Sequence, residues 1–212
     1  MRDDVRAVRT ANDEHLRRFA DSALVNLVRE PGLPDGAKGR VLEHLQPWSD
    51  AFQRVVTLRV ACENDDELRH LAQQHLAEEL NHNRLLADSR AAEGAGTWDP
   101  VIAAASSWFV DQMFSRSGIE RVALAHLVLE GSGMVFHQSG SAAYPGNEYF
   151  ALHDEADEEH MEMGYQLLQE RTDWQVDDVL RLLDQGWKMI ILLCDRVAGL
   201  AVSGEQLVPE PA

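Results

Sequence analysis

The segment that decides the fold runs from Ala123 to Glu130 and reads ALAHLVLE. It lies inside a stretch whose pattern predicts a helix over about 118–138, and it ends on a carboxylate where a plain helical bundle would place another leucine. Burying a lone carboxylate in such a run is costly unless a cation or a hydrogen-bond partner meets it. We therefore expect partners for Glu130 on neighbouring helices.

The rest of the chain is predicted to be helical as well. Apolar residues recur every three or four positions, and Gly and Pro gather at a few breaks. The expected helices cover about 10–30, 38–62, 65–89, 100–116, 118–138, 148–171 and 173–201. The prediction is an all-α fold, a single-domain bundle of about seven helices over residues 1–212, with a short mobile tail after about Val202.

Composition excludes several classes of function. The 212 residues hold 19 Lys+Arg against 36 Asp+Glu, a net charge of −17, which argues against nucleic acid and anionic membrane as partners. No apolar run approaches the roughly 18 residues of a membrane span, and the N-terminus lacks the apolar stretch of a secretory signal. The two cysteines, Cys62 and Cys194, are too few for a disulfide framework, so we expect a reduced cytoplasmic protein.

Two further stretches carry side chains typical of metal ligands. His153, Asp157 and His160 fall at i, i+4 and i+7 of one expected helix, so they share a face. Glu79 and His82 are three residues apart on another. Carboxylates mixed with imidazoles suit iron or manganese better than a structural zinc or calcium site. Together with Glu130, these stretches favour a shared pair of metal ions.

The sequence resembles the haem-oxygenase-like diiron oxidases and oxygenases, whose fold is shared with haem oxygenase, thiaminase-type proteins and pyrroloquinoline-quinone synthase. The matching stretches are 68–82, 129–131 and 148–160, in the family's order, and the resemblance spans roughly 40–200. The most specific element is His-x-x-x-Asp-x-x-His preceded by Tyr-Phe. The intervals between the stretches are short for the family, so trimmed loops are expected around the site.

The resemblance implies a ligand set and a chemistry. Members carry one further Glu on the preceding helix, for which Glu43 is the candidate and Asp50 the fallback. The expected metal ligands are Glu43, Glu79, His82, Glu130, His153, Asp157 and His160. They would hold two Fe ions, Fe(II) at rest, with O2 as co-substrate. The implied function is a non-haem diiron oxidase or oxygenase of biosynthesis, performing N-oxygenation, desaturation or oxidative C–C cleavage on a small molecule.

Details of the substrate and partners are hypotheses of the same kind. An amino acid or derivative is the preferred substrate, and an external electron donor and a homodimer are expected from the fold family. Arg84, Arg116 and Arg121 are candidates for holding a substrate carboxylate. His75 is left out of the ligand set. His126, near Glu130, is interpreted as a satisfied core residue, and so is His137.

Three alternatives remain open. A metal-free enzyme of the thiaminase or quinone-synthase type would use the same His and Glu side chains as acid–base groups. A non-enzymatic helical protein could bind iron without turnover. Haem oxygenase proper is disfavoured because His15 lacks the surrounding sequence of a haem ligand.

Overall fold

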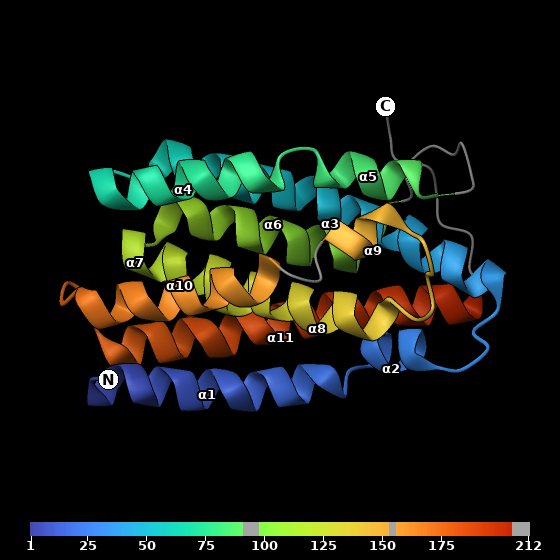
Figure 1. Cartoon of the computed structure of the whole chain (residues 1–212), viewed down its shortest axis with the longest axis horizontal. Coiled ribbons are helices and arrows are strands. Elements are labelled where there is room, and N and C mark those ends of the chain that lie inside the picture. The colour runs from blue at the N-terminus through green and yellow to red at the C-terminus, as the bar shows by residue number, and fades with distance from the viewer. Residues whose placement is uncertain (91–97, 153–155, 205–212) are drawn as a thin grey trace.

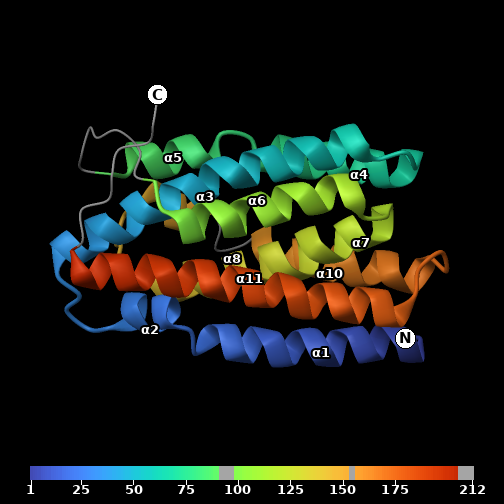
Figure 2. The same cartoon turned by 180° about the vertical axis from the view of Figure 1, so that it is seen from behind.

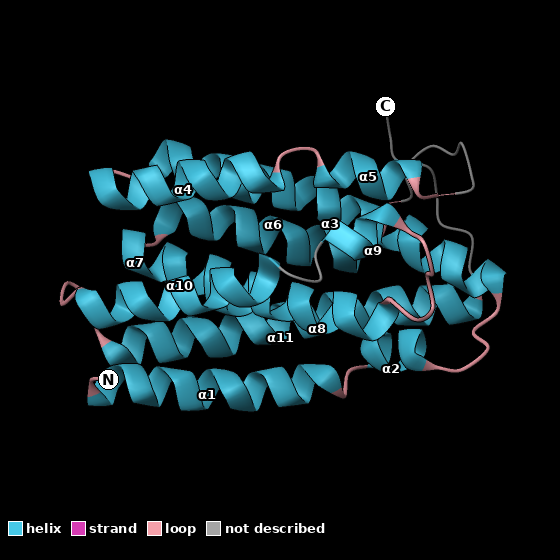
Figure 3. Ribbon diagram, in the orientation of Figure 1, coloured by secondary structure: helices cyan, strands magenta, loops and turns pink. Residues whose placement is uncertain are grey.

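The computed structural model describes residues 1–90, 98–152 and 156–204, with the backbone alone at 156–159. In this part of the chain every regular element is a helix, as Figures 1 and 3 show, which confirms the all-α prediction. The predicted mobile tail lies, beyond Gly204, outside the described residues. No described helix is long and apolar enough to cross a membrane.

The helices follow one another along the chain with short connections. In order they are α1 (Asp3–Ala20), α2 (Ala23–Arg29), α3 (Asp35–Cys62), α4 (Asp66–Glu79), α5 (His82–Asp88), α6 (Pro100–Ser115), α7 (Gly118–Val122), the π-helix η1 (Ala123–Glu130), α8 (Gly131–Gly140), α9 (Glu148–Leu152), α10 (Ala156–Glu170) and α11 (Val176–Ser203).

Each of these elements overlaps one of the seven expected helical segments, but α1 begins at Asp3 rather than near residue 10, and two of the segments are interrupted within the described residues. The first segment breaks at Asp21 and Ser22, between α1 and α2. The third breaks at Leu80 and Asn81, where Asn81 takes a left-handed backbone with φ 73°. Asparagine tolerates this conformation better than most residues. The sequence predicts that Glu79 and His82 share one helix, but in the structure they lie on either side of a turn.

The long helices lie side by side along the long axis of the molecule (Figures 1 and 2). In both views α4 and α5 form one edge, α1 forms the opposite edge, and α10, α11 and the continuous rod from α7 to α8 run between them. The core is made of fully buried large side chains such as Trp187, Phe109 and Leu124. Each apolar side chain of this size stabilises the fold by about 1.5–3 kcal/mol on burial.

The π-helix η1 lies at the centre of this packing, and all its residues are buried. Two glycines let neighbouring helices approach it. A Cβ at Gly164 of α10 would lie 2.8 Å from the Cβ of His126, and one at Gly186 of α11 would lie 2.8 Å from Leu124. π-helical turns recur at functional sites because they alter which side chains share a face. Here both His126 and Glu130 reach the ring of His75 on α4.

Candidate metal centre and pocket

Glu130 meets imidazoles from two other helices. The Nε2 of His75 lies 2.8 Å from its Oε1, and the Nδ1 of His160, on α10, lies 3.3 Å from its Oε2. Burial by itself raises the pKa of Glu130, but the His75 and His160 rings outweigh it and hold this pKa well below the usual value. These are partners of the kind that the apolar run around Glu130 requires.

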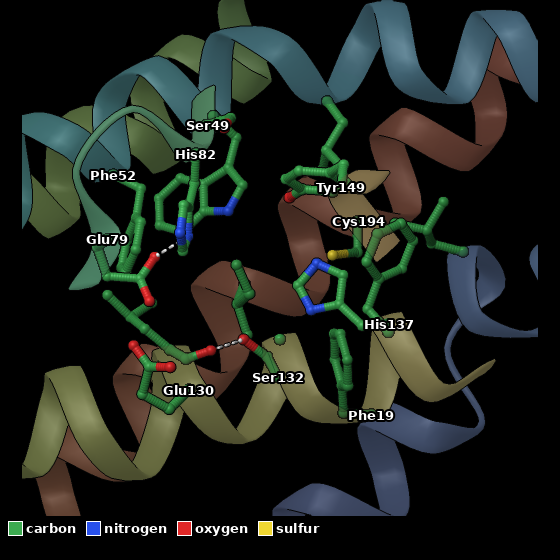
Figure 4. Close-up of a pocket in the computed structure, with 17 residues that line it drawn as sticks. Phe19, Ser49, Phe52, Glu79, His82, Glu130, Ser132, His137, Tyr149 and Cys194 are labelled. Carbon is green, nitrogen blue, oxygen red and sulfur yellow. Dashed lines mark hydrogen bonds and ion pairs between the residues drawn. The ribbon is translucent and has the colours of Figure 1, made fainter. Parts of the chain in front are cut away.

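Glu79 completes a compact group with these residues. His75, Glu79, Glu130 and His160, here called the His–Glu cluster, are all buried, and one donor atom from each lies within 4.8 Å of the others. The Nδ1 of His82, at the start of α5, lies 2.8 Å from Oε2 of Glu79 (Figure 4). Carboxylate oxygens and imidazole nitrogens in such proximity form a donor set that suits a divalent transition metal.

His75 differs from the other members of the cluster because Arg59 of α3 holds its second nitrogen. The Nη1 of Arg59 lies 3.0 Å from Nδ1 of His75, and only 1% of Arg59 is exposed. Burial lowers the pKa of Arg59 to about 10, so it remains cationic at neutral pH. A guanidinium can only donate, so Nδ1 of His75 accepts and its Nε2 carries the proton that faces Glu130. His75 is therefore a donor to Glu130 in this arrangement.

The structure does not bring Glu43 to the cluster, and this corrects the expectation for α3. Glu43 is partly exposed, whereas the inward face of α3 carries side chains at helical spacing: Leu45, Trp48, Ser49 and Phe52. The fallback Asp50 is also off this face, because its Oδ1 accepts from the amides of Gln46 at 2.9 Å and Asn83 at 2.8 Å. Both acidic residues have the wrong helical phase.

Two expected ligands fall outside the described residues. His153 lies in the gap between α9 and α10, and Asp157 has a described backbone on α10 but no described side chain. Their roles remain predictions.

His160 is tied to a second carboxylate. Its Nε2 lies 2.8 Å from Oε2 of Glu78, an exposed residue of α4. Burial lowers the pKa of His160, but the hydrogen bonds and charges of Glu130 and Glu78 outweigh this and raise it to about 9. In the metal-free chain His160 therefore carries a proton at neutral pH. A metal bound at this ring would have to displace that proton.

His126 is a feature that sequence reasoning misjudged. It is fully buried, its ring centre lies 5.0 Å from that of His75 and 6.3 Å from that of His160, and neither of its nitrogens has a hydrogen-bond partner within the described chain. Burial lowers its pKa well below the usual value, with Arg59 and His75 adding to the effect. It is a core histidine, as expected, but an unsatisfied one. The available signal was its position four residues before Glu130.

A pocket opens beside the cluster. Its empty space, with the open solvent at its mouth included, amounts to about 660 Å³. Figure 4 shows Glu79, His82 and Glu130 on one side of it and His137, Tyr149 and Cys194 on the other. Apolar side chains make up most of the remaining lining, here called the apolar wall: Phe19, Leu24, Leu45, Trp48, Phe52, Leu129, Phe136 and Ile190.

The arginines suggested for a substrate carboxylate do not line this pocket. Arg121 is buried against Glu63, with Nη2 3.0 Å from Oε2. Arg116 donates to Gln112, and Arg84 is exposed on α5. The structure uses the first two to join helix ends rather than to bind a ligand.

Comparison with known proteins identifies relatives at the level of sequence and of structure. The uncharacterized protein RP592 of Rickettsia prowazekii is 30% identical over 192 residues, covering 88% of this chain and 91% of that protein. No protein-family model matches.

Three solved structures are similar over almost the whole chain. A TenA homologue from Pseudomonas syringae pv. tomato has a TM-score of 0.74 at 15% identity and covers 92% of both chains. A Shewanella denitrificans domain with a heme oxygenase-like fold has a TM-score of 0.66 at 15% identity, over 95% of this chain and 94% of that one. A putative TenA-like thiaminase from Sulfolobus solfataricus has a TM-score of 0.66 at 8% identity, over 98% and 100%. At these identities the similarity shows the fold alone.

Proposed function

Because the chain belongs to the family of the uncharacterized Rickettsia protein and has the haem-oxygenase-like fold, we propose that it is an enzyme whose His–Glu cluster binds a redox-active divalent metal beside a small-molecule pocket. The observation that carries the proposal is the convergence of four buried His and Glu side chains, with one donor atom of each within 4.8 Å of the others. Buried carboxylates this close to one another are unfavourable unless positive charge or hydrogen-bond donors lie between them.

The residues present fit a metal. Glu79, Glu130 and His160 offer donor atoms within the cluster, and His82 reaches Glu79. These carboxylates would neutralise one divalent ion, with neutral imidazoles completing its shell. Cys194 is not a ligand here, since it lies across the pocket and burial raises the pKa of its thiol. A second ion would need His153 and Asp157, which remain sequence predictions.

When bound, a pair of Fe(II) ions would supply reduction of O2 coupled to oxidation of the substrate. The chain's own residues prepare the site for this. His75 fixes the direction of the Glu130 carboxylate, and Arg59 fixes His75. The Glu78 carboxylate, 2.8 Å from Nε2 of His160, holds that ring in place, and the ring would lose a proton on binding a metal. The apolar wall of the pocket excludes water from the reacting groups.

A metal-free enzyme is the second candidate, and the comparisons support it better than the O2-dependent one, since the similar structures include TenA homologues and a putative TenA-like thiaminase. The contacts within the cluster also suit it. Every ring nitrogen of His75 and His160 has a hydrogen-bonding partner without any metal. In this function protonated His160 would act as a general acid and a carboxylate of the cluster as a general base.

Metal content separates the two candidates. The purified chain is stripped with a chelator, loaded anaerobically with Fe(II), desalted and analysed by elemental mass spectrometry. Tightly held iron that Glu130→Gln abolishes, while Glu162→Gln at an exposed position of α10 does not, supports the metal centre. Absence of bound iron supports the metal-free enzyme. Substrate-dependent O2 uptake then distinguishes an oxidase from a protein that only stores iron.

A further inference from the structure

We propose that the pocket beside the His–Glu cluster binds a molecule with an uncharged aromatic or branched aliphatic body, and that any carboxylate of this molecule must lie at the cluster end. The part played by the cluster end rests on the proposed function, but binding of the uncharged body does not. The inference comes from the distribution of apolar and charged side chains around the pocket.

Most of the side chains that line the pocket are apolar, and Ser49 and Ser132 add two hydroxyl groups. Trp48 and Phe52 come from α3, with ring centres 6.1 Å apart, and Phe136 of α8 and Ile190 of α11 lie among the other lining residues. Phe52 also packs edge-on to His75, with ring centres 6.4 Å apart, so the aromatic wall continues to the cluster. Rings and branched chains of this kind favour a flat or bulky apolar body rather than a hydrated polar one.

Charge in the pocket is of one sign. Its described lining includes the carboxylates of Glu79 and Glu130 and contains no Lys or Arg. Two buried cations stand behind these carboxylates, outside the described lining: protonated His160, whose Nδ1 lies 3.3 Å from Oε2 of Glu130, and Arg59, whose Nη1 points at the ring of His75. A substrate carboxylate that lies against the apolar side chains of the lining would lose its hydration without gaining a cation, which is strongly unfavourable. At the cluster end a bound metal could meet it.

The side of the pocket opposite the His–Glu cluster carries side chains that can hydrogen-bond to a ligand, but it has no Lys or Arg to pair with a ligand carboxylate. Tyr149 and His137 lie there, with ring centres 5.2 Å apart, opposite Glu79 and His82 (Figure 4). A hydroxyl or amide on the ligand fits this side. An α-amino acid fits poorly. If its ammonium group pairs with Glu79 or Glu130, its own carboxylate lies close to these carboxylates without a cation of its own. The preferred substrate class therefore shifts from amino acids to molecules that are neutral over most of their length.

Three probes with one body test this: 3-phenylpropanol, 3-phenylpropanoate and L-phenylalanine. Their dissociation constants are measured by titration calorimetry against the full chain, stripped of metal and then loaded with Mn(II) under argon. We expect the alcohol to bind both forms of the chain. The propanoate should bind the stripped form at least about tenfold more weakly than the alcohol does, and its affinity should rise on metal loading. Phenylalanine should bind most weakly of the three. Phenylalanine binding the stripped chain as tightly as the alcohol would overturn the proposal.

Matched variants show whether binding occurs in this pocket. Trp48→Ala removes part of the apolar wall and should raise the dissociation constant of the alcohol about tenfold. Trp108→Ala, on α6 and outside the lining residues, should leave the alcohol's affinity unchanged. Equal effects of the two variants, or no binding of the alcohol to either form, would contradict the proposal. If Mn(II) does not bind, the proposed metal function fails, but the alcohol's binding to the stripped chain is still measured.

Discussion

Arg59 holds His75 from behind, with Nη1 of the guanidinium 3.0 Å from Nδ1 of the ring, while the opposite nitrogen of that ring lies 2.8 Å from Glu130. The guanidinium has no lone pair to offer, so the proton of His75 is directed at the carboxylate. The short distances within the His–Glu cluster therefore suggest one metal ligand too many, since His75 serves as a hydrogen-bond donor to Glu130. Of the four clustered side chains, Glu79, Glu130 and His160 keep an oxygen or a nitrogen that can bind a metal without first removing Arg59 from its partner.

His75→Gln should keep its bound metal. Glutamine retains an N–H that can donate to Glu130, and loss of an orienting partner of this kind costs about 10–100-fold in metal affinity rather than the metal itself. Iron per chain after anaerobic loading, measured by elemental mass spectrometry at saturating Fe(II), should equal that of the wild type. In the wild type, ¹⁵N NMR should show the Nε2-protonated tautomer of His75. Complete loss of iron in His75→Gln would mean that His75 is itself a ligand.

Arg59→Met should destabilise the metal-free protein. Arg59 is buried beside a carboxylate cluster, and removing one partner of a buried charged network costs about 3–5 kcal/mol because the opposite charge is left uncompensated. Urea denaturation of the stripped chain measures the change in unfolding free energy. Arg54→Met, an exposed arginine on the same helix, is the control and should change it by less than about 0.5 kcal/mol. Equal stability of the two variants would show that Arg59 contributes nothing to the fold.

How far the sequence predicts the structure is seen best along α3 and at Asn81. Periodicity predicts α3 to within three residues at its start, yet the carboxylate suggested there, Glu43, is on the wrong face. A ligand candidate taken from sequence order alone ignores helical phase, which Leu45, Trp48 and Phe52 define. Likewise the turn at Asn81 depends on one left-handed residue that periodicity does not detect. Glu79 and His82 still meet, because the turn brings their side chains together.

A site residue can be predicted from the sequence where it interrupts the apolar pattern of its helix, and it cannot be predicted where it fits that pattern. Glu130 in an apolar run points to buried partners, and the structure supplies His75 and His160. Arg59 gives no such signal, because an arginine in an amphipathic helix is ordinarily a surface residue. Its burial depends on which helices pack against α3, and that is a tertiary property. The same holds for the π-helical turn at His126, which local sequence does not specify.

Asp157→Ala should lower the iron content without removing all of it. The described donors of the cluster suit one ion, and the spacing of His153, Asp157 and His160 predicts ligands for a second. We expect about two irons per chain in the wild type and about one in the variant, measured after identical loading and desalting. Helix content by circular dichroism should be unchanged. Unaltered iron content would remove Asp157 from the ligand set.

Gly164→Ala should disturb the cluster from a distance. The added methyl would lie 2.8 Å from the Cβ of His126, so α10 must move away from η1, and His160 moves with it. We expect weaker metal binding and a loss of about 1–3 kcal/mol of unfolding free energy from overpacking. Gly39→Ala is the matched control, since the space around Gly39 in α3 is open and alanine should stabilise the helix by about 0.5–1 kcal/mol. Destabilisation by both variants alike would contradict this account of Gly164.

The metal-free protein should lose stability as the pH rises through the pKa of His160. This pKa is raised to about 9 by Glu130 and Glu78, against about 6.5 in the unfolded chain, so the folded state holds the proton more tightly. The resulting stabilisation is fully present below about pH 6.5 and disappears between about pH 6.5 and 9, with an upper limit of about 3 kcal/mol.

Urea denaturation of the chelator-treated wild type and of His160→Gln at pH 6, 7.5 and 9 measures this stabilisation as the difference in unfolding free energy between the two proteins. That difference should shrink with rising pH, and Glu78→Gln should shift the change to lower pH. Saturation with metal should abolish the pH dependence, because a ring bound to a metal no longer carries the proton. A difference that stays constant from pH 6 to 9 in the stripped protein would show that folding does not raise the pKa of His160.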